Sequence, residues 1–493
     1  MRPHLSKSRY LAGRQCLRRL WLACHAPELA EAPDAALAAV LEAGAEVGRR
    51  AHLLFPGGVL VEETGFATAA AQTRALLADP SVPAIFEGAF ACEGVRIRVD
   101  VLERLAAGAW GLREVKSSSG VKEVHLDDVA VQRHVLEGCG LEVRSVELVH
   151  VDAGYVRGEG GIDWPRLFAR VELADLLAER RGEVPARLRQ MRAALELDEA
   201  PLVDPSPHCW TPYGCEFWRH CTREKPADWI LHLPSLRPAR LAALHAAGVE
   251  RITEIPAEFP LLAVQARIRA VLRSGREEVS RDLAAALAGL EPPVSALDFE
   301  TMSPAIPLYP GTRPYERIPF QWSLHRLEAD GSLAHASFLA DGRDDPRRPF
   351  AATLLAALHG SGPVLVYSGF EASVLGELAR ALPDLATALA AVRARLCDLH
   401  AVVRRHVYHP GFAYSFSLKA VAPALVPGFG YDDLEGIAAG GHAAVEFARI
   451  AAGLCDATED ARIRRALLAY CARDTLALVE LHRALRARAQ SVA

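Results

Sequence analysis

The sequence has no long hydrophobic run and no segment of the secretory signal type. Its 493 residues contain no stretch of 18 consecutive apolar residues, which a membrane-spanning helix requires. The first residues, MRPHLSKSRYLAGRQC, are basic and interrupted by glycine, whereas a signal peptide has a continuous apolar segment. These absences predict a cytoplasmic protein that has no membrane partner.

The sequence also lacks a surplus of positive charge. Lys and Arg number 56 against 61 Asp and Glu, so the formal net charge is −5. A chain with this balance has no global basic field, and any surface for nucleic acid must be local. Internal repeats and low-complexity segments are also missing. A chain of this length is too long for one hydrophobic core and predicts two or three domains.

Changes in hydrophobic pattern predict an α/β architecture with three regions. Residues 1–225 begin with helical stretches and continue with β-type runs between 84 and 117. Residues 226–290 read as a helical connector, in which LPSLRPARLAALHAAGVERITEIP is similar to a helix-hairpin-helix. Residues 291–493 begin with a proline pair and the strand VSALDFE, and they end in helices.

Two local predictions concern single elements. The segment FQWSLHRLEADGSLAHASFLA has an Asp-Gly turn between two β-type runs and predicts a hairpin. The segment WPRLFARVELADLLAERRGEVPARLRQMRAALEL predicts one long helix.

Cysteine is distributed unevenly. Six of the ten cysteines are scattered and are predicted to be small buried hydrophobic residues: Cys24, Cys92, Cys139, Cys397, Cys455 and Cys471. Cys209, Cys215 and Cys221 are clustered in HCWTPYGCEFWRHC, with five residues between neighbours. In a cytoplasmic protein such cysteines are thiols or metal ligands rather than disulfides. Three thiolates are one ligand short of a closed tetrahedral site.

A first set of chemically suitable residues lies in the N-terminal region. Asp100 ends VRIRVD, and Glu114 and Lys116 follow in REVKS. Glu114 and Lys116 share one strand face because strand side chains alternate with period two. An Asp and a Glu from paired strands can hold a divalent cation, and a Lys beside them can position or activate water. His52 can add a nitrogen ligand, and Gln132 on the next helix can hydrogen-bond the site.

This ordered set resembles the RecB-like branch of the PD-(D/E)XK nucleases. The resemblance implies a restriction-endonuclease-like fold for residues 1–225, with Mg²⁺ or Mn²⁺ held by His52, Asp100 and Glu114, and with Lys116 and Gln132 as catalytic residues. The family motif continues to a Tyr where this chain has Leu136, so the final helix matches in part. The alternative is an ordinary β-hairpin with a surface Glu–Lys pair.

Several members of this branch, including the CRISPR-associated RecB-like nucleases and the AddB-type recombination nucleases, carry an iron–sulfur cluster that joins the two ends of the domain. SKSRYLAGRQCLRRLWL is similar to their N-terminal segment and supplies Cys16. The resemblance implies a 4Fe–4S cluster bound by Cys16, Cys209, Cys215 and Cys221. Zinc is an alternative, although zinc sites usually have cysteines two to four residues apart. His208 and His220 can each replace a cysteine, but they lie beside ligands already assigned, and the absence of any metal is a third reading.

A second set of acids lies in residues 291–493. Asp298 and Glu300 in ALDFET share a strand face, and Glu371 follows a strand in GFEAS. Tyr470 and Asp474 in YCARDT lie one helical turn apart. Four carboxylates at the end of a sheet can bind two divalent cations, and a tyrosine one turn before a ligand can orient the attacking water. Each acid taken alone can equally be a solvated charge.

The order of this set resembles that of the DEDDy 3′–5′ exonucleases, which have an RNase H-like fold, over residues 290–490. The resemblance implies metal binding by Asp298, Glu300, Glu371 and Asp474, and a catalytic role for Tyr470. The family usually has Asp at the middle position, so Glu371 is a departure and Asp398 competes with it for that role. Lys419 or Ser417 is a candidate phosphate contact.

The chain as a whole is similar to bacterial proteins that fuse these two nuclease domains. It is therefore expected to be a Mg²⁺- or Mn²⁺-dependent nuclease that hydrolyses phosphodiester bonds of DNA, at single strands or ends, in repair, recombination or defence. One alternative is a nucleic-acid-binding scaffold with one inactive nuclease domain. Another is that the C-terminal domain acts on RNA. The sequence does not specify protein partners, cleavage polarity or oligomeric state.

Overall fold

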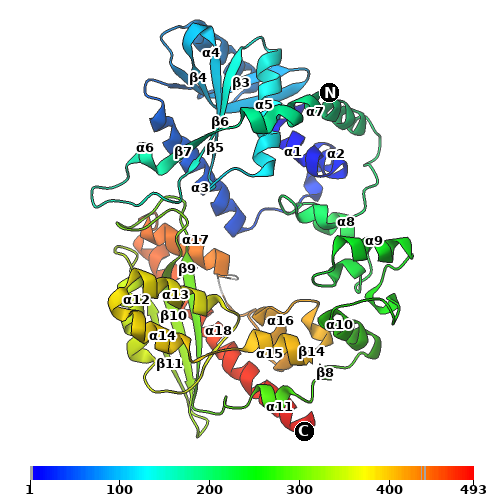
Figure 1. Ribbon diagram of the computed structural model, residues 1–493, viewed down its shortest axis with the longest axis vertical. Coiled ribbons are helices and arrows are strands. Elements are labelled where there is room, and N and C mark those ends of the chain that lie inside the picture. The colour runs from blue at the N-terminus through cyan, green and yellow to red at the C-terminus, as the bar shows by residue number, and fades with distance from the viewer. Residues whose placement is uncertain (1–3, 435, 438–439, 493) are drawn as a thin grey trace. The chain divides into compact units, whose positions relative to one another are not determined.

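The computed structural model describes residues 4–434, 436–437 and 440–492 of the chain, which forms a mixed α/β fold (Figure 1). The chain divides into two compact units. Unit 1 consists of Met1–Glu224 and Pro304–Glu316, and unit 2 consists of Lys225–Ser303 and Arg317–Ala493. Among the described residues, none of the helices combines the length and the apolar character needed to cross a membrane.

A mixed sheet forms the centre of unit 1. The strands run in the order β2-β3-β4-β5-β6-β7, and β1 pairs with β4. Pairs β3–β4 and β4–β5 are antiparallel, whereas β5 and β6 are parallel and need a crossover helix between them. The strands are β1 (Leu5–Ser6), β2 (Val59–Leu60), β3 (Ala84–Cys92), β4 (Val95–Arg104), β5 (Trp110–Lys116), β6 (Val143–Val151) and β7 (Phe168–Glu172).

Helices of unit 1 pack against this sheet and against each other. The crossover helix α5 contacts α1 and α7, and α1 contacts α2. Apolar side chains from these helices and from the strands form one core, which includes Leu20, Val129 and Leu188. The helices are α1 (Lys7–Gln15), α2 (Leu17–His25), α3 (Ala35–Ala51), α4 (Phe66–Ala78), α5 (Glu123–Gly138), α6 (Trp164–Leu167), α7 (Ala174–Leu195) and α8 (Trp218–Thr222), with short 3₁₀ turns η1 (Pro27–Leu29), η2 (His52–Leu54), η3 (Ala106–Gly108) and η4 (Pro207–Trp210).

The long helix predicted after Trp164 is wrong, because a strand interrupts it. Residues 168–172 form β7, which pairs antiparallel with β6. The guanidinium of Arg170 also lies 2.5 Å from Glu147 Oε2 on β6. Pairing with the open edge of β6 satisfies backbone groups that a local helical pattern does not take into account. The helix therefore resumes only at Ala174.

Unit 2 is built on a five-stranded sheet with the order β11-β10-β9-β12-β13. β9, β10 and β11 are antiparallel, and β12 and β13 run parallel to β9. The predicted hairpin is confirmed, since β10 and β11 pair from Gln321–Leu339 to Leu327–Leu333. The strands are β9 (Val294–Met302), β10 (Ile318–Leu327), β11 (Leu333–Leu339), β12 (Val364–Val366) and β13 (Leu396–Asp398).

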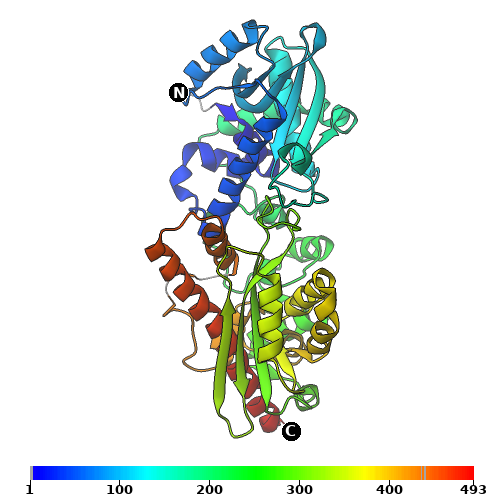
Figure 2. The ribbon, with the colours of Figure 1, turned by 90° about the vertical axis from the view of Figure 1, so that its left-hand side faces the viewer.

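The two faces of this sheet carry different helices (Figure 2). One face holds an apolar core between Phe299, Trp322 and the helices α12 (Arg347–Ala357), α13 (Phe370–Ala381) and α14 (Ala386–Arg393). The long helix α18 (Ala457–Val492) contacts β9 and β10 on the other face. Because strand side chains alternate, Leu297 and Phe299 enter the apolar core, and Asp298 and Glu300 lie on the side of α18.

The remaining elements of unit 2 include the predicted connector. The first helix of the expected helical hairpin is present as α9, but the second is only the turn η6. Pro256 and Pro260 follow that turn and disfavour a longer helix there. The elements are η5 (Ile230–His232), α9 (Pro238–Ala246), η6 (Ile252–Glu254), α10 (Ala263–Ser274), β8 (Glu278–Val279), α11 (Leu283–Ala286), η7 (Pro383–Leu385), α15 (Leu399–His406), β14 (Val407–Tyr408), η8 (Pro410–Phe412), α16 (Leu418–Leu425) and α17 (Gly440–Ala451).

Candidate functional site

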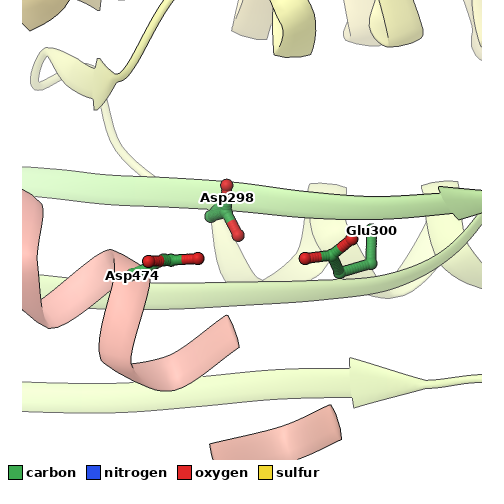
Figure 3. A group of neighbouring side chains, drawn as sticks. All are labelled: Asp298, Glu300 and Asp474. Carbon is green, nitrogen blue, oxygen red and sulfur yellow. The ribbon is translucent and has the colours of Figure 1, made fainter. Parts of the chain in front are cut away.

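Three carboxylates meet between β9 and α18 in unit 2. Asp298 and Glu300 lie two residues apart on β9, and Asp474 comes from α18 (Figure 3). One oxygen from each carboxylate lies within 4.8 Å of the others. Within residues 4–434, 436–437 and 440–492 this is the one group of three or more acidic, His or Cys residues whose ligand atoms are this close. We call it the C-terminal acid site.

The C-terminal acid site crowds three carboxyl groups into a poorly solvated place. Burial raises the pKa of Asp298 to about 8, and the charge of Asp474 adds to that shift. Burial also raises the pKa of Glu300 and of Asp474, while the positive charge of Lys419 opposes all three shifts. Carboxylates that resist ionisation when crowded are stabilised in the charged form by a divalent cation. The oxygen-only donor set suits Mg²⁺ or Mn²⁺.

The two competing middle acids have different environments. Glu371 lies in the first turn of α13, is 2% exposed, and has an Oε2 atom without a hydrogen-bond partner. Burial and the charge of Asp298 raise its pKa. Asp398 instead caps α15, and its Oδ1 accepts hydrogen bonds from the backbone N–H groups of Ser368 at 2.8 Å and His400 at 2.9 Å. Glu371 therefore has the free ligand atom, although it lies outside the closest group of three.

Tyr470 lies one turn before Asp474 on α18, and Lys419 lies over its ring at 4.5 Å from the centroid. Burial raises the pKa of Tyr470, and the charge of Asp474 adds to the shift. Ser417 is the N-cap residue of α16, the helix that carries Lys419. The predicted set of Tyr470, Lys419 and the acids is thus brought together around α18.

Two further side chains contact the C-terminal acid site, and neither belongs to a sequence motif. The hydroxyl of Tyr431 donates to Asp474 Oδ1 at 2.7 Å. The thiol of Cys471, which is fully buried, donates to Asp298 Oδ2 at 3.3 Å. Tyr431 lies in an irregular segment, where no periodic pattern predicts which way a side chain points. Cys471 adjoins Tyr470, so its position on α18 was the available signal.

In unit 1, Glu114 on β5 is the centre of a second charged group. Lys116 Nζ donates to Glu114 Oε1 at 2.5 Å and to Asp128 Oδ2 at 2.7 Å. Gln132 Nε2 donates to Glu114 Oε2 at 2.7 Å and to Asp128 Oδ1 at 3.1 Å. Asp100 on β4 accepts a hydrogen bond of 2.8 Å from the backbone N–H of Val115. We call Asp100, Glu114 and Asp128 the N-terminal acid site.

Lys7 is a second cation in the N-terminal acid site. Its Nζ lies 3.0 Å from Glu114 Oε1 and 3.6 Å from Asp100 Oδ1. Burial alone would lower the pKa of Lys7, but the carboxylates of Asp100 and Glu114 raise it well above its usual value. Burial raises the pKa of Asp100 to about 6, and the charge of Glu114 adds to that shift.

Sequence reasoning missed both Lys7 and Asp128. Asp128 could have been predicted from the sequence, because it lies one helical turn before Gln132 on α5. Lys7 had no comparable signal, since its place depends on β1 pairing with β4.

His52 does not join the carboxylates as the sequence suggested. Its ring stacks on Phe86 with centroids 3.9 Å apart, and burial lowers its pKa. His52, Asp100 and Glu114 are not a group of ligand atoms within 4.8 Å in the described structure. Leu136, at the position of the family tyrosine, is fully buried in the apolar core. The N-terminal acid site thus contains Asp100 and Glu114 of the predicted set together with Asp128. Lys116 and Gln132 of the predicted set contact it, as does Lys7.

The four cysteines assigned to a cluster line one small cavity in unit 1. Cys16, Cys209, Cys215 and Cys221 share its wall with Gln15 and His208. Gln15 Nε2 donates to the carbonyls of His208 and Tyr213, both at 2.8 Å, and Arg19 pairs with Glu216. These bonds connect the first two helices to the loop of residues 208–221, which we call the cysteine loop, although nearly two hundred residues separate them. None of these four cysteines is part of a disulfide.

The prediction for the six scattered cysteines is confirmed for Cys471 and holds in part for Cys24 and Cys92, which pack against the apolar core of unit 1. Cys139 is exposed, and the other four are partly exposed. Cys139 is the C-cap of α5, an exposed position at the end of the helix, and its thiol donates to the carbonyl oxygen of Ala91 on β3 at 3.4 Å. A cysteine without a motif therefore does not have to be a core residue.

Comparison with known proteins gives one family match, and the description of that family states no activity. A family described as a domain of unknown function (DUF2779) matches residues 295–417, which include Asp298, Glu300 and Glu371 but not Asp474. No curated protein matches the chain. Part of unit 2 is thus similar to a family without a stated activity, and the chemistry must be argued from the side chains themselves.

Proposed function

We propose that the protein is a metal-dependent nuclease that hydrolyses phosphodiester bonds of DNA, at single strands or ends. The observation that carries this proposal is the convergence of Asp298, Glu300 and Asp474 within 4.8 Å, with Tyr470 one helical turn from Asp474. The arrangement has three of the four acids and the phenol that the DEDDy resemblance implies. An RNase H-like fold for unit 2 and a restriction-endonuclease-like fold for unit 1 are part of the proposal.

At the C-terminal acid site, Asp298, Glu300 and Asp474 would hold Mg²⁺ or Mn²⁺, and Glu371 offers an unpaired buried oxygen as a fourth ligand. The cations would supply an activated water and neutralise charge on the phosphate. Tyr470 orients the attacking water through its hydroxyl. Lys419, which lies over the rings of Tyr470 and Tyr431, brings a positive charge to the DNA phosphates.

At the N-terminal acid site, Asp100 and Glu114 would hold the same kind of cation. Lys116 would then give up part of its contact with Glu114 and stabilise charge on the phosphate, while Asp128 keeps its ammonium in place. Gln132 holds the Glu114 carboxylate in one orientation through its amide. The oxygen Oε1 of Gln132 has no hydrogen-bond partner and can accept one from a bound water.

The cysteine cavity supports the proposal of a structural 4Fe–4S cluster bound by Cys16, Cys209, Cys215 and Cys221. Zinc at about 2.3 Å from four thiolates would bring their sulfurs to about 3.8 Å from one another. No three cysteine sulfurs of the described residues lie within 4.8 Å. A four-iron cluster, in which each thiolate binds a different iron, spaces the sulfurs more widely than zinc does, and this favours the cluster over zinc in the proposal.

The scaffold alternative, with an inactive N-terminal domain, has specific support. His52 stacks on Phe86, and Lys7 lies among the acids. RNA as the substrate of unit 2 is the other alternative, because the C-terminal acid site has no residue set that would exclude a 2′-hydroxyl.

The test of the main proposal is hydrolysis of labelled single-stranded DNA with Mg²⁺ or Mn²⁺, and with EDTA as the control. The Asp298→Asn variant keeps the size of the side chain but removes a charged ligand. It is expected to lose cleavage by unit 2 on the order of 10³-fold. An equal rate in EDTA would exclude metal-dependent cleavage. Matched DNA and RNA oligomers distinguish the two polymers.

A further inference from the structure

Lys7 holds an unusual position for a lysine. Strand β1 ends at Ser6, where it pairs with Arg96 of β4, and α1 begins at Lys7. Its ammonium lies 3.0 Å from Glu114 Oε1, 3.6 Å from Asp100 Oδ1 and 3.9 Å from Asp128 Oδ1. These three carboxylates come from β4, β5 and α5. One compact positive charge therefore lies between the two carboxylates that the proposed function assigns to a divalent cation.

The charge balance of the N-terminal acid site explains why the position of Lys7 affects the binding of a divalent cation. Asp100, Glu114 and Asp128 contribute three negative charges, which Lys7 and Lys116 offset only in part. Lys116 contacts Glu114 and Asp128, whereas Lys7 is the lysine that lies close to Asp100. Replacing Lys7 by a divalent cation would bring the charge of the three acids and Lys116 to neutrality. A cation entering beside Lys7 instead meets electrostatic repulsion at short distance.

The lysine can move, but the helix that carries it is fixed. The side chain of Lys7 is 25% exposed, and its four-carbon stem is flexible. Helix α1 is held at its start by β1 and at its end by Gln15, which donates to two carbonyls of the cysteine loop. The ammonium can therefore leave the carboxylates without displacing the helix, and it returns to the same place when they are free.

We propose that Lys7 is a built-in competitor of the divalent cation at the N-terminal acid site. It occupies the position between Asp100 and Glu114 when no cation is bound there, and it must withdraw when one binds. This inference rests on the proposed nuclease function of unit 1 and adds a residue that sets how much metal the site needs. The N-terminal acid site then loads only at a higher Mg²⁺ or Mn²⁺ concentration than its carboxylates alone would require.

The test is Mn²⁺ binding to the full-length protein, followed by electron paramagnetic resonance of the free ion. All proteins carry Asp474→Asn, which weakens the C-terminal acid site so that binding in unit 1 is resolved. Lys7→Met keeps the length of the side chain and removes the charge, and it is expected to bind Mn²⁺ about tenfold more tightly. Lys122→Met removes an exposed lysine at the start of α5 and is expected to bind as the parent does.

The other possible results distinguish failure of the competitor role of Lys7 from failure of the proposed metal site. Unchanged affinity in Lys7→Met, with a normal circular dichroism spectrum, overturns the competitor role and leaves the proposed nuclease site standing. If adding Glu114→Gln does not remove the Mn²⁺ that Lys7→Met binds, the proposed N-terminal metal site itself is wrong. Should Lys7→Met fail to fold, Lys7→Gln and Lys7→Arg decide the matter. The neutral glutamine must tighten binding, and the charged arginine must not.

Discussion

The hydroxyl of Tyr431 donates a hydrogen bond of 2.7 Å to Oδ1 of Asp474, the carboxylate that lies one helical turn after Tyr470. Two phenols therefore lie close to one candidate metal ligand. Burial raises the pKa of Asp474, and the hydrogen bond from Tyr431 opposes that shift. Tyr431 thus favours the charged carboxylate, and a hydrogen bond from Tyr470 acts on the pKa of Asp474 in the same direction.

The Tyr431→Phe variant tests the first of these roles. Without the hydrogen bond, the pKa of Asp474 rises further, so a higher pH is needed before the carboxylate can bind a cation. The pH at which Mn²⁺ begins to bind unit 2 is therefore expected to rise. Once the carboxylate is ionised, the Mn²⁺ affinity is expected to be normal. Binding curves measured between pH 5.5 and 8.5 show the shift, and coincident curves would contradict this role.

The Tyr470→Phe variant tests the proposed role of Tyr470 in orienting water. It removes the hydroxyl that orients water and leaves the carboxylates in place. Cleavage by unit 2 is expected to fall by at least about 10²-fold, with Mn²⁺ affinity unchanged once the pH is high enough to ionise Asp474 without the hydrogen bond from Tyr470. Single-turnover hydrolysis and Mn²⁺ titration of the same preparation separate the two effects. A variant that loses metal affinity and rate together would make Tyr470 a structural support of Asp474.

The stability of the metal-free protein is expected to fall as the pH rises from about 4 to about 8. Burial, with the charge of Asp474, raises the pKa of Asp298 from 3.8 to about 8. The folded state therefore holds this proton more tightly than the unfolded state, and its stabilising effect is lost as pH rises through the folded pKa. Urea denaturation in EDTA at several pH values measures the slope. The Asp298→Asn variant should have a smaller slope of unfolding free energy against pH. An equal slope in the variant would show that Asp298 does not cause the pH dependence.

The Cys16→Ser variant tests the cysteine cavity. Protein purified without oxygen is expected to be brown, with a broad shoulder near about 400 nm that dithionite bleaches. Cys16→Ser should lose that absorption and destabilise unit 1, because binding at such a site is coupled to folding. Cys139→Ser changes an exposed cysteine of the same unit and should keep both properties. A colourless protein that contains one zinc would instead support the zinc alternative.

The Asp128→Asn variant tests an acid that the motif did not include. Lys116 and Gln132 both donate to Asp128, so the substitution leaves a buried ammonium with fewer partners. The free energy of unfolding of unit 1 is expected to fall by about 1–3 kcal/mol, and cleavage by unit 1 should also fall. Asp198→Asn, at an exposed position after α7, is the matched control. Equal stabilities for the two variants would show that Asp128 is dispensable.

The parts of the two sites that could be predicted depend on local spacing. Asp298 and Glu300 share a face because strands alternate, and Tyr470 and Asp474 share one because a helical turn separates them. Contacts that depend on distant pairing were missed. Lys7 reaches Glu114 only because β1 joins β4, and β7 forms only because β6 has an open edge. The stacking of His52 on Phe86 was not predicted either, since a ring contact between distant residues cannot be read from position in the chain.

The central claim, that both acid sites hydrolyse DNA, is tested most directly by a cleavage assay on four proteins with Mn²⁺. These are the unchanged chain, Lys116→Ala, Asp298→Ala and the variant that combines both substitutions. Single-stranded DNA labelled at the 3′ end in one set and at the 5′ end in another shows which products each unit releases. Each single substitution is expected to remove a different part of the cleavage, and the combined variant is expected to remove all of it. Full metal-dependent cleavage by the combined variant would show that neither acid site hydrolyses DNA.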